Sequence, residues 1–368
     1  MAAAWLLLLG ILAQDPAGAA LRTPGFEDGE VLPYDLLVLP GEGAAGEELE
    51  LVLRGESGFF PVREGRFKAL AELEPGVNEL LLRSGGEERR LRLVCRPLRQ
   101  ERAVRFVYAL AADGEGRFDA PPGEPNGVES ARRRIALGAR LMQSFTAEKL
   151  CQAGHGRRTF RVLAGPDGAP AVEVVRSSKS AAELAGMDGY ALWDHFYAEL
   201  EGLAERESTI DVVLMAFSHW DAEAESYTGH TALGGGRLAL FGSAQLHSWA
   251  ESLAQVPARF GDARPVPAEH VRDDSCFRGS FWANYATTLG ATLHELGHCF
   301  GLPHQDEGVM ARGFDLFNRS FVVEEPVDGG GRGGIRSITL DQETRWHPAS
   351  AAILAENPWL AEAGAEEE

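Results

Sequence analysis

The sequence predicts an α+β fold, in which a small β-sandwich precedes a larger part with a mixed sheet and packed helices. Three observations lead to this prediction. Short apolar segments separated by turn residues run from Leu32 to Pro97 without a helical pattern between them. Beyond Pro97, strand-like and helix-like segments alternate along the chain. The helix-like segments carry apolar residues three and four positions apart, which is typical of helices that bury one face.

The composition excludes several classes of protein and partner. The 368 residues are 45% hydrophobic and 24% charged, and the formal net charge is -20. These values are ordinary for a globular chain and exclude a mostly disordered or collagen-like one. Because negative charge repels phosphate, we expect neither nucleic acid nor an anionic membrane as a partner. The oligomeric state stays open.

Lysine and cysteine are both rare. Lysine occurs only at Lys68, Lys149 and Lys179, which we interpret as a codon preference for arginine. The 4 cysteines are too few for a disulfide scaffold. One or two bridges remain open if the chain is secreted.

The first twenty residues (1–20) allow two interpretations. Trp5 to Ala13 form a short apolar run, and Ala17-Gly18-Ala19 follow it. This pattern is typical of a secretory signal peptide, which would make the protein secreted. The alternative is a disordered Ala-rich extension on a cytoplasmic protein. The run is too short to cross a bilayer, and no other run reaches the roughly eighteen apolar residues needed, so we expect no membrane span.

Residues 21–100 are expected to form the β-sandwich domain. Its strands are predicted at Leu49–Leu53, Asn78–Leu82 and Leu91–Val94, with turn residues between them. Strands at this spacing without intervening helices favour a small sandwich.

Residues 101–325 are expected to form the second domain. Predicted strands are Val104–Leu110, Thr159–Leu163, Ala171–Val175, Ile210–Phe217 and Leu238–Phe241. One helix should begin after Asn126, which would act as its cap, and another carries Leu192 to Leu203. Residues 326–368 are expected to form a Gly-rich linker, one helical segment and an acidic tail.

Residues 294–304 read HELGHCFGLPH and carry the chemistry of the chain. His294 and His298 are four residues apart, so on a helix they lie on one face and can bind one Zn²⁺ ion. Gly301 can end the helix in a left-handed conformation, after which His304 can return as third ligand. Glu295 is angled to reach a metal-bound water instead of the metal.

The residues before this motif predict the helix that presents it. An apolar stripe advances by three and four positions and lies opposite the two histidines: Trp282, Tyr285, Leu289, Leu293, Leu296 and Phe300. The small residues Thr287 and Ala291 on the other face are expected to leave room above the metal.

The motif HExxHxxGxxH resembles the long zinc motif of the metzincin clan of metalloendopeptidases. Gly308-Val309-Met310 looks like the methionine turn of that clan, which implies that Met310 lies beneath the metal. The resemblance implies a metzincin-like catalytic domain built around an active-site helix. The methionine follows the third histidine more closely than usual, and no tyrosine follows Tyr285. Cys95, in VCRPL, does not match the latency motif of matrix metalloproteinases.

Longer stretches resemble a little-studied eukaryotic family of zinc metallopeptidases. They are FDAPPGEPNGVESARRR, AEKLCQAGHGRRTF, SHWD followed by TGHTALGGGRLALFG, and HQDEGVMARGFDLFNRSF. This resemblance covers most of the chain from about Phe106 to Phe321. Fungal members often add a C-terminal jacalin-like domain, which we do not expect here, so no sugar-binding role carries over.

Several other residues have two interpretations each. His219 and His230 are either structural or in contact with substrate. Residues 234–242 could form a sheet edge that pairs with an extended peptide, or a plain hairpin. Cys299 is expected to be a buried small residue. Asp306 could replace a ligand, but His304 has the better spacing and type.

The sequence thus predicts a zinc-dependent peptidase, most simply an endopeptidase acting on a peptide or protein substrate. His294, His298 and His304 would bind one catalytic Zn²⁺, and Glu295 would serve as general base. Two alternatives stay open. One is a zinc hydrolase of a non-peptide amide, and the other is a binding protein with a vestigial metal site. The cleavage preference and the group that stabilises the oxyanion are not predicted.

Overall fold

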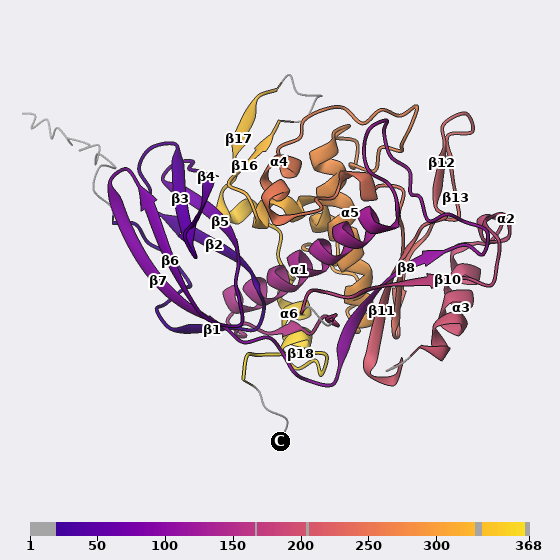
Figure 1. The fold of residues 1–368 in the computed structure, drawn as a ribbon, viewed down its shortest axis with the longest axis horizontal. Coiled ribbons are helices and arrows are strands. Elements are labelled where there is room, and N and C mark those ends of the chain that lie inside the picture. Colours follow the sequence, from indigo (N-terminus) through magenta and orange to yellow (C-terminus); the bar gives the residue numbers. More distant parts are fainter. Residues whose placement is uncertain (1–19, 166–167, 204–205, 328–332, 365–368) are drawn as a thin grey trace, which may run out of the picture.

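The computed structural model describes residues 20–165, 168–203, 206–327 and 333–364. The apolar run behind the signal-peptide interpretation lies outside these described residues. Figure 1 shows an α+β chain whose N-terminal strands lie at one end and whose helices lie beyond them. None of the helices in the described ranges combines the length and apolar character needed to cross a membrane.

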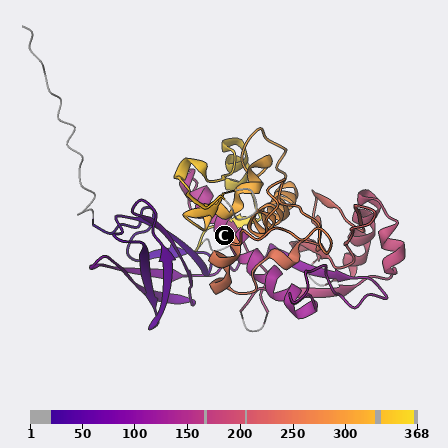
Figure 2. The same cartoon turned by 90° about the horizontal axis from the view of Figure 1, so that it is seen from above.

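In the described residues up to Cys95, the regular secondary structure consists of strands. They are β1 (Glu30–Leu32), β2 (Leu36–Glu42), β3 (Glu48–Leu53), β4 (Glu56–Pro61), β5 (Arg66–Glu72), β6 (Gly76–Ser84) and β7 (Glu87–Cys95). One sheet has the order β1-β7-β6-β3-β4, and β2 pairs with β5 separately. The three strands predicted here lie within β3, β6 and β7. Figure 2 shows these strands beside the helix-containing part.

A second sheet forms the centre of the remaining chain. Its order is β10 (Val172–Arg176), β8 (Ala103–Leu110), β11 (Thr209–Met215), β15 (Leu238–Gly242) and β14 (Ala232–Gly235). All pairs are parallel except β14 with β15, so β14 is an antiparallel edge strand. This is the mixed sheet that the sequence predicts. Its inner strands β8, β11 and β15 are buried along their whole length.

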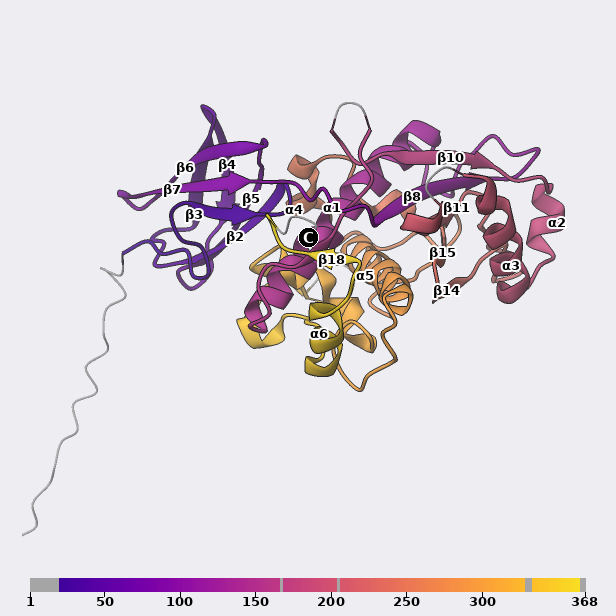
Figure 3. The same cartoon turned by 90° about the horizontal axis from the view of Figure 1, so that it is seen from below.

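Helices cover both faces of this sheet. Alternate side chains of β8 and β11 enter one core with α1 (Val128–Gln152) and α5 (Phe281–Cys299), and the others enter a second core with α3 (Gly189–Glu199). The alternation follows from the two-residue period of a strand. Figure 3 shows the strands between α3 on one side and α5 on the other.

Shorter elements complete the structure. They are β9 (Thr159–Phe160), α2 (Ala181–Ala185), β12 (His219–Asp221), β13 (Ser226–Thr228), α4 (Val256–Phe260), β16 (Glu324–Pro326), β17 (Ile335–Ser337), α6 (Pro348–Ala355) and β18 (Leu360–Ala361), with 3₁₀ turns η1 (Leu200–Gly202), η2 (Arg206–Ser208), η3 (Leu246–Ser248), η4 (Leu253–Gln255), η5 (Arg312–Ser320) and η6 (Leu340–Gln342).

Two local expectations differ from the structure. Asn126 does not cap α1, because its amide donates to the carbonyl of Phe118 and Gly127 takes the cap position. The strand expected from Thr159 to Leu163 is short, since β9 ends at Phe160 and pairs with the C-terminal strand β18.

Trp346 and Leu354 also join the main core, so the chain after the Gly-rich stretch packs against the rest of the molecule.

Candidate metal centre

Helix α5 carries the first two histidines and is almost entirely buried. All six residues of the predicted apolar stripe are at most 5% exposed. The helix ends where predicted. Gly301 has a φ of 80°, a left-handed conformation that favours glycine, and its N–H donates to the carbonyl of His298 at 3.0 Å. The chain therefore reverses directly after α5 and brings His304 back toward it.

The imidazole rings of His294, His298 and His304 converge on one point. The Nε2 atom of His298 lies 3.1 Å from Nε2 of His294 and 3.2 Å from Nε2 of His304. The ligand atoms of all three histidines lie within 4.8 Å of one another. Among the described residues, these histidines form the group that could hold a metal ion.

Backbone carbonyls orient two of these rings. The carbonyl of Val309 faces Nδ1 of His294 at 2.8 Å, and the carbonyl of Leu302 faces Nδ1 of His298 at 2.9 Å. A carbonyl can only accept, so each Nδ1 carries the hydrogen and each Nε2 presents a lone pair. Second partners of this kind fix the tautomer of metal-binding histidines.

The separations of the nitrogen atoms suit zinc. With Zn–N distances of about 2.0–2.1 Å, two ligands of a tetrahedral ion lie roughly 3.4 Å apart. Two lone pairs that face each other at 3.1 Å repel unless a cation lies between them. The three histidines therefore fit a zinc ion with a fourth position left for water.

Burial keeps the candidate ligands neutral. It lowers the pKa of His294 to about 4, against the opposing effect of the Val309 hydrogen bond. Burial also lowers the pKa of His298, with the Leu302 hydrogen bond acting in the opposite direction. Neutral imidazole is the form that binds metal, so both rings are ready to bind at neutral pH.

Glu295 lies apart from the histidine group and faces the edge strand β14. The backbone N–H of Gly234 faces the carboxylate of Glu295. Burial raises the pKa of Glu295 to about 7, although the nearby N–H of Gly234 lowers it in part. A carboxyl group with a pKa near neutrality can both accept and return a proton, as a general base requires.

The close approach of β14 to α5 depends on glycine. A Cβ atom on Gly234 would lie 2.0 Å from the backbone oxygen of Glu295. Any side chain at this position would push the strand from the helix and remove the N–H donor from the carboxylate.

Met310 lies in a turn that touches α5 and is 0% exposed. The N–H of Gln305 donates to the carbonyl of Met310 at 3.0 Å, which closes the loop directly after His304. The neighbouring carbonyl of Val309 holds His294. The turn thus connects two of the three histidines.

The face of α5 above the histidines is less open than expected. Thr287 is 7% exposed, because the Arg278 Nη2 atom donates to its hydroxyl at 2.7 Å and to the carbonyl of Asp315 at 2.9 Å. The Phe314 ring in η5 lies edge-on to His294, with 5.4 Å between ring centroids. Packing of η5 against α5 therefore fills space that the small residues of the helix leave.

The remaining candidates lie outside the histidine group. His219 pairs with Asp119 at 2.8 Å, and this hydrogen bond raises the pKa of His219. His230 stacks on Tyr227 with 4.4 Å between ring centroids. The Asp306 side chain is 90% exposed and lies 3.6 Å from His347.

Two further expectations concern cysteine and the edge strand. Cys299 is buried, as expected, and burial raises the pKa of its thiol to about 12. All four cysteines lie in the described ranges and are unpaired. Residues 234–242 span the end of β14 and all of β15, so they form both a hairpin and a sheet edge.

Backbone groups make up the part of the site that sequence reasoning missed. The carbonyls of Val309 and Leu302 and the N–H of Gly234 belong to no recognisable side-chain pattern. The one available signal was the run Gly234-Gly235-Gly236, because glycine within a strand often marks a close approach of another backbone.

Comparison with known proteins places the chain in a family. Residues 26–367 match the family described as "Putative peptidase family" (Metallopep). Two curated yeast proteins, each named a putative zinc metalloproteinase, are similar to this chain. The Schizosaccharomyces pombe protein is 30% identical, with 76% of this chain and 49% of that protein covered. The Saccharomyces cerevisiae protein is 32% identical, with 78% and 47% covered. The chain spans about half the length of these relatives.

A solved structure also resembles the chain at low identity. It is that of catalytically inactive OgpA from Akkermansia muciniphila in complex with an O-glycopeptide substrate, with 15% identity, a TM-score of 0.42 and coverage of 70% of this chain and 60% of that one. The family match, in contrast, extends over nearly the whole sequence. The chain therefore belongs to the Metallopep family, the "Putative peptidase family".

Proposed function

We propose that this chain is a zinc-dependent endopeptidase in which His294, His298 and His304 bind one Zn²⁺ ion. The observation that carries the proposal is the convergence of three Nε2 atoms, two of them on rings whose Nδ1 atoms face carbonyls. The yeast relatives, whose names specify zinc metalloproteinases, support the choice of metal and reaction. When bound, zinc would polarise the scissile carbonyl and lower the pKa of a coordinated water.

Glu295 is the general base of this proposal. Its carboxylate would accept a proton from the attacking water and pass it to the leaving amine. The N–H of Gly234 orients the carboxylate, and burial holds the pKa of Glu295 near 7, where both transfers are feasible. The residues Gly301 and Met310 have supporting roles, because they shape the chain on either side of His304.

The edge strand β14 is the proposed site for the peptide. It is the last strand of its sheet, and it contacts α5 at Glu295. An extended peptide could pair with its free edge, which is a common mode of peptide recognition. Such pairing would align the peptide beside the histidine group and suit an endopeptidase, since it needs no chain terminus.

The proposal extends to domain organisation. Residues 101–325 would form a metzincin-like catalytic domain, and residues 21–100 a β-sandwich domain in front of it. Residues 326–368 would form the C-terminal extension, with a peptide or protein as the partner of the catalytic domain.

One experiment tests the proposal directly. The purified chain is analysed for metal and incubated with a mixed-peptide library, and the products are identified by mass spectrometry. We expect one zinc per chain and cleavage at internal peptide bonds. Zinc without cleavage of any peptide would favour a hydrolase of non-peptide amides. The absence of both bound zinc and peptide cleavage would favour a binding protein with a vestigial site.

A further inference from the structure

A cavity of about 480 Å³ lies between the N-terminal strands, α1 and the C-terminal part of the chain. Its walls come from β2, β5, the last turns of α1, the end of η5 and the segment around η6. None of its lining residues belongs to the histidine group. The volume falls within the range of roughly 300–1,000 Å³ that is common for small-molecule pockets.

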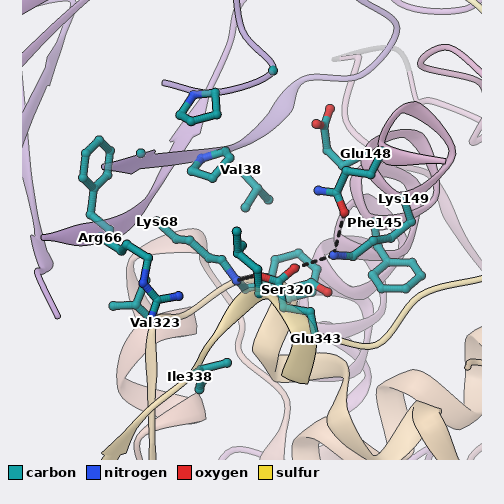
Figure 4. A pocket seen from close by; sticks show the side chains of 18 of the residues that line it. Val38, Arg66, Lys68, Phe145, Glu148, Lys149, Ser320, Val323, Ile338 and Glu343 are labelled. Carbon is teal, nitrogen blue, oxygen red and sulfur yellow. Dashed lines mark hydrogen bonds and ion pairs between the residues drawn. The ribbon is translucent and has the colours of Figure 1, made fainter. Parts of the chain in front are cut away.

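Two lysines and one carboxylate meet in this cavity. Lys68 Nζ donates to Glu343 Oε1 at 2.6 Å, and Lys149 Nζ donates to Glu343 Oε2 at 2.5 Å. All three side chains are at most 8% exposed. Figure 4 shows the two ammonium groups reaching Glu343 from opposite sides. The cluster holds two positive charges and one negative charge.

The other charged groups of the lining do not compensate this excess. Glu148 pairs with Arg157 at 2.7 Å, and Glu42 lies 3.4 Å from Arg22. Neither arginine lines the cavity, so each of these glutamates is balanced by a residue outside the lining. Arg66, which does line it, has Glu64 as its partner, so it leaves the excess charge of the lysine pair unchanged. Its buried Nη2 atom has no hydrogen-bond partner among the described residues and lies 3.6 Å from Glu64. An uncompensated buried charge is costly, and here burial lowers the pKa of Lys68 to about 8.

Each ammonium group retains one hydrogen for a ligand. An ammonium group has three donors. In the described part of the chain, Lys68 donates to Glu343 and to the carbonyl of Arg319. Lys149 donates to Glu343 and to Gln152 Oε1. The two remaining N–H donors are equal in number to the two oxygens of one carboxylate.

The choice of lysine at these positions is informative. The chain has 35 basic residues and only three of them are lysine, yet two of the three meet at Glu343. A codon preference for arginine does not explain this placement. A compact ammonium group directs its donors freely, whereas the planar guanidinium has a fixed geometry.

Much of the remaining lining is apolar. Val38, Phe145, Phe321, Val323 and Ile338 contribute to its walls, and the Leu340 residue on the lining is 68% exposed. An exposed large apolar side chain beside a cavity offers contact area to a ligand that enters there. The cavity thus combines an apolar body with a cationic end.

We propose that this cavity binds an amphipathic carboxylate, whose head group accepts hydrogen bonds from Lys68 and Lys149 and whose apolar body lies against Phe145 and Phe321. A single negative charge balances the excess of the lysine pair. The site is separate from the proposed zinc centre and does not depend on peptidase activity.

Calorimetric titration of the full chain with decanoate, below its micelle-forming concentration, tests the proposal. We expect saturable binding of one decanoate per chain. Lys68→Met and Lys149→Met each leave Glu343 with one lysine, so the fold should persist, and each should weaken binding about tenfold or more. Lys179→Met is the matched control, because it removes the remaining lysine, which does not line the cavity, and it should leave the affinity unchanged.

Ligand variants test the same point on the unaltered protein. Acetate has the head group without the apolar body, and decylamine has the body with the opposite charge. Both should bind at least tenfold more weakly than decanoate. The proposal is overturned if decanoate does not bind, if decylamine binds as tightly, or if decanoate binds equally to the parent and both folded methionine variants.

Discussion

The sulfur atom of Met310 lies 2.5 Å from the position that a Cβ atom on Gly297 would occupy. The glycine within the HELGH segment therefore lets the turn that carries Met310 approach α5 between the helical turns that carry His294 and His298. Since the carbonyl of the preceding Val309 orients His294, this contact links the packing of Met310 to the geometry of the histidine group.

Gly297→Ala should destabilise the protein by about 1–3 kcal/mol, because the added methyl group overpacks the contact with Met310. The helix propensity of alanine offsets up to about 1 kcal/mol of this cost. Urea unfolding measures the change. In a Met310→Ala background the sulfur is absent, so the cost of Gly297→Ala should shrink. An equal cost in both backgrounds would show that the contact does not determine it.

Met310→Leu should retain zinc and most activity, because the substitution nearly conserves volume and Met310 packs instead of binding metal. The expected loss of stability is below about 1.5 kcal/mol. Metal analysis of the purified variant is the measurement. Loss of stoichiometric zinc would mean that the turn has another role.

Glu295→Ala separates chemistry from metal binding. The variant should fold, retain one zinc per chain and lose turnover by about a hundredfold or more, as expected for a missing general base. His298→Ala removes a ligand, so tight zinc binding and activity should disappear together. Peptide cleavage by Glu295→Ala at the parent's rate would exclude the proposed mechanism. Loss of its zinc would make Glu295 a ligand.

Gly234→Ala tests the contact between β14 and α5. The new methyl group would meet the backbone oxygen of Glu295 at 2.0 Å, so the strand must move and its N–H must leave the carboxylate. We expect a loss of kcat/KM of tenfold or more with zinc retained. The matched control is Gly235→Ala, where a Cβ atom meets nothing within 4 Å. Equal activity of the two variants would contradict this role of Gly234.

His247 should make the protein sensitive to acid. It is 0% exposed, and burial, with Arg134 and Arg259 nearby, lowers its pKa to about 3. The unfolded chain binds a proton at this residue below about pH 6.5, whereas the folded protein does so only near pH 3. The contribution of His247 to the free energy of unfolding is therefore constant above about pH 6.5. It decreases as the pH falls below that value, by about 2 kcal/mol at pH 5.

His247→Phe should remove this part of the pH dependence. Urea unfolding at pH 7 and pH 5 should show a smaller loss of stability in the variant than in the parent. His270→Phe, which changes an exposed histidine, should leave the parent's dependence intact. Identical pH dependence in His247→Phe and the parent would refute the assignment.

Local patterns predicted a large share of this structure. The spacing of His294 and His298 and the apolar stripe of α5 depend only on the helical period, so they could be derived before any contact was known. The left-handed position of Gly301 follows likewise from the conformational freedom of glycine. The alternation of strands and helices after Pro97 was sufficient to predict a mixed sheet.

The contacts that complete the two sites depended on tertiary structure. The carbonyl of Val309 and the N–H of Gly234 are backbone groups that every non-proline residue has, so their partners follow from strand register and helix packing. Lys68, Lys149 and Glu343 lie on three distant segments and meet only when the N-terminal strands pack against α1. By itself the sequence determined which side chains could bind a metal and on which helix face they lie. Only the fold decided which neighbours orient those side chains, because residues far apart in the chain become neighbours through packing and carry no joint pattern in the sequence.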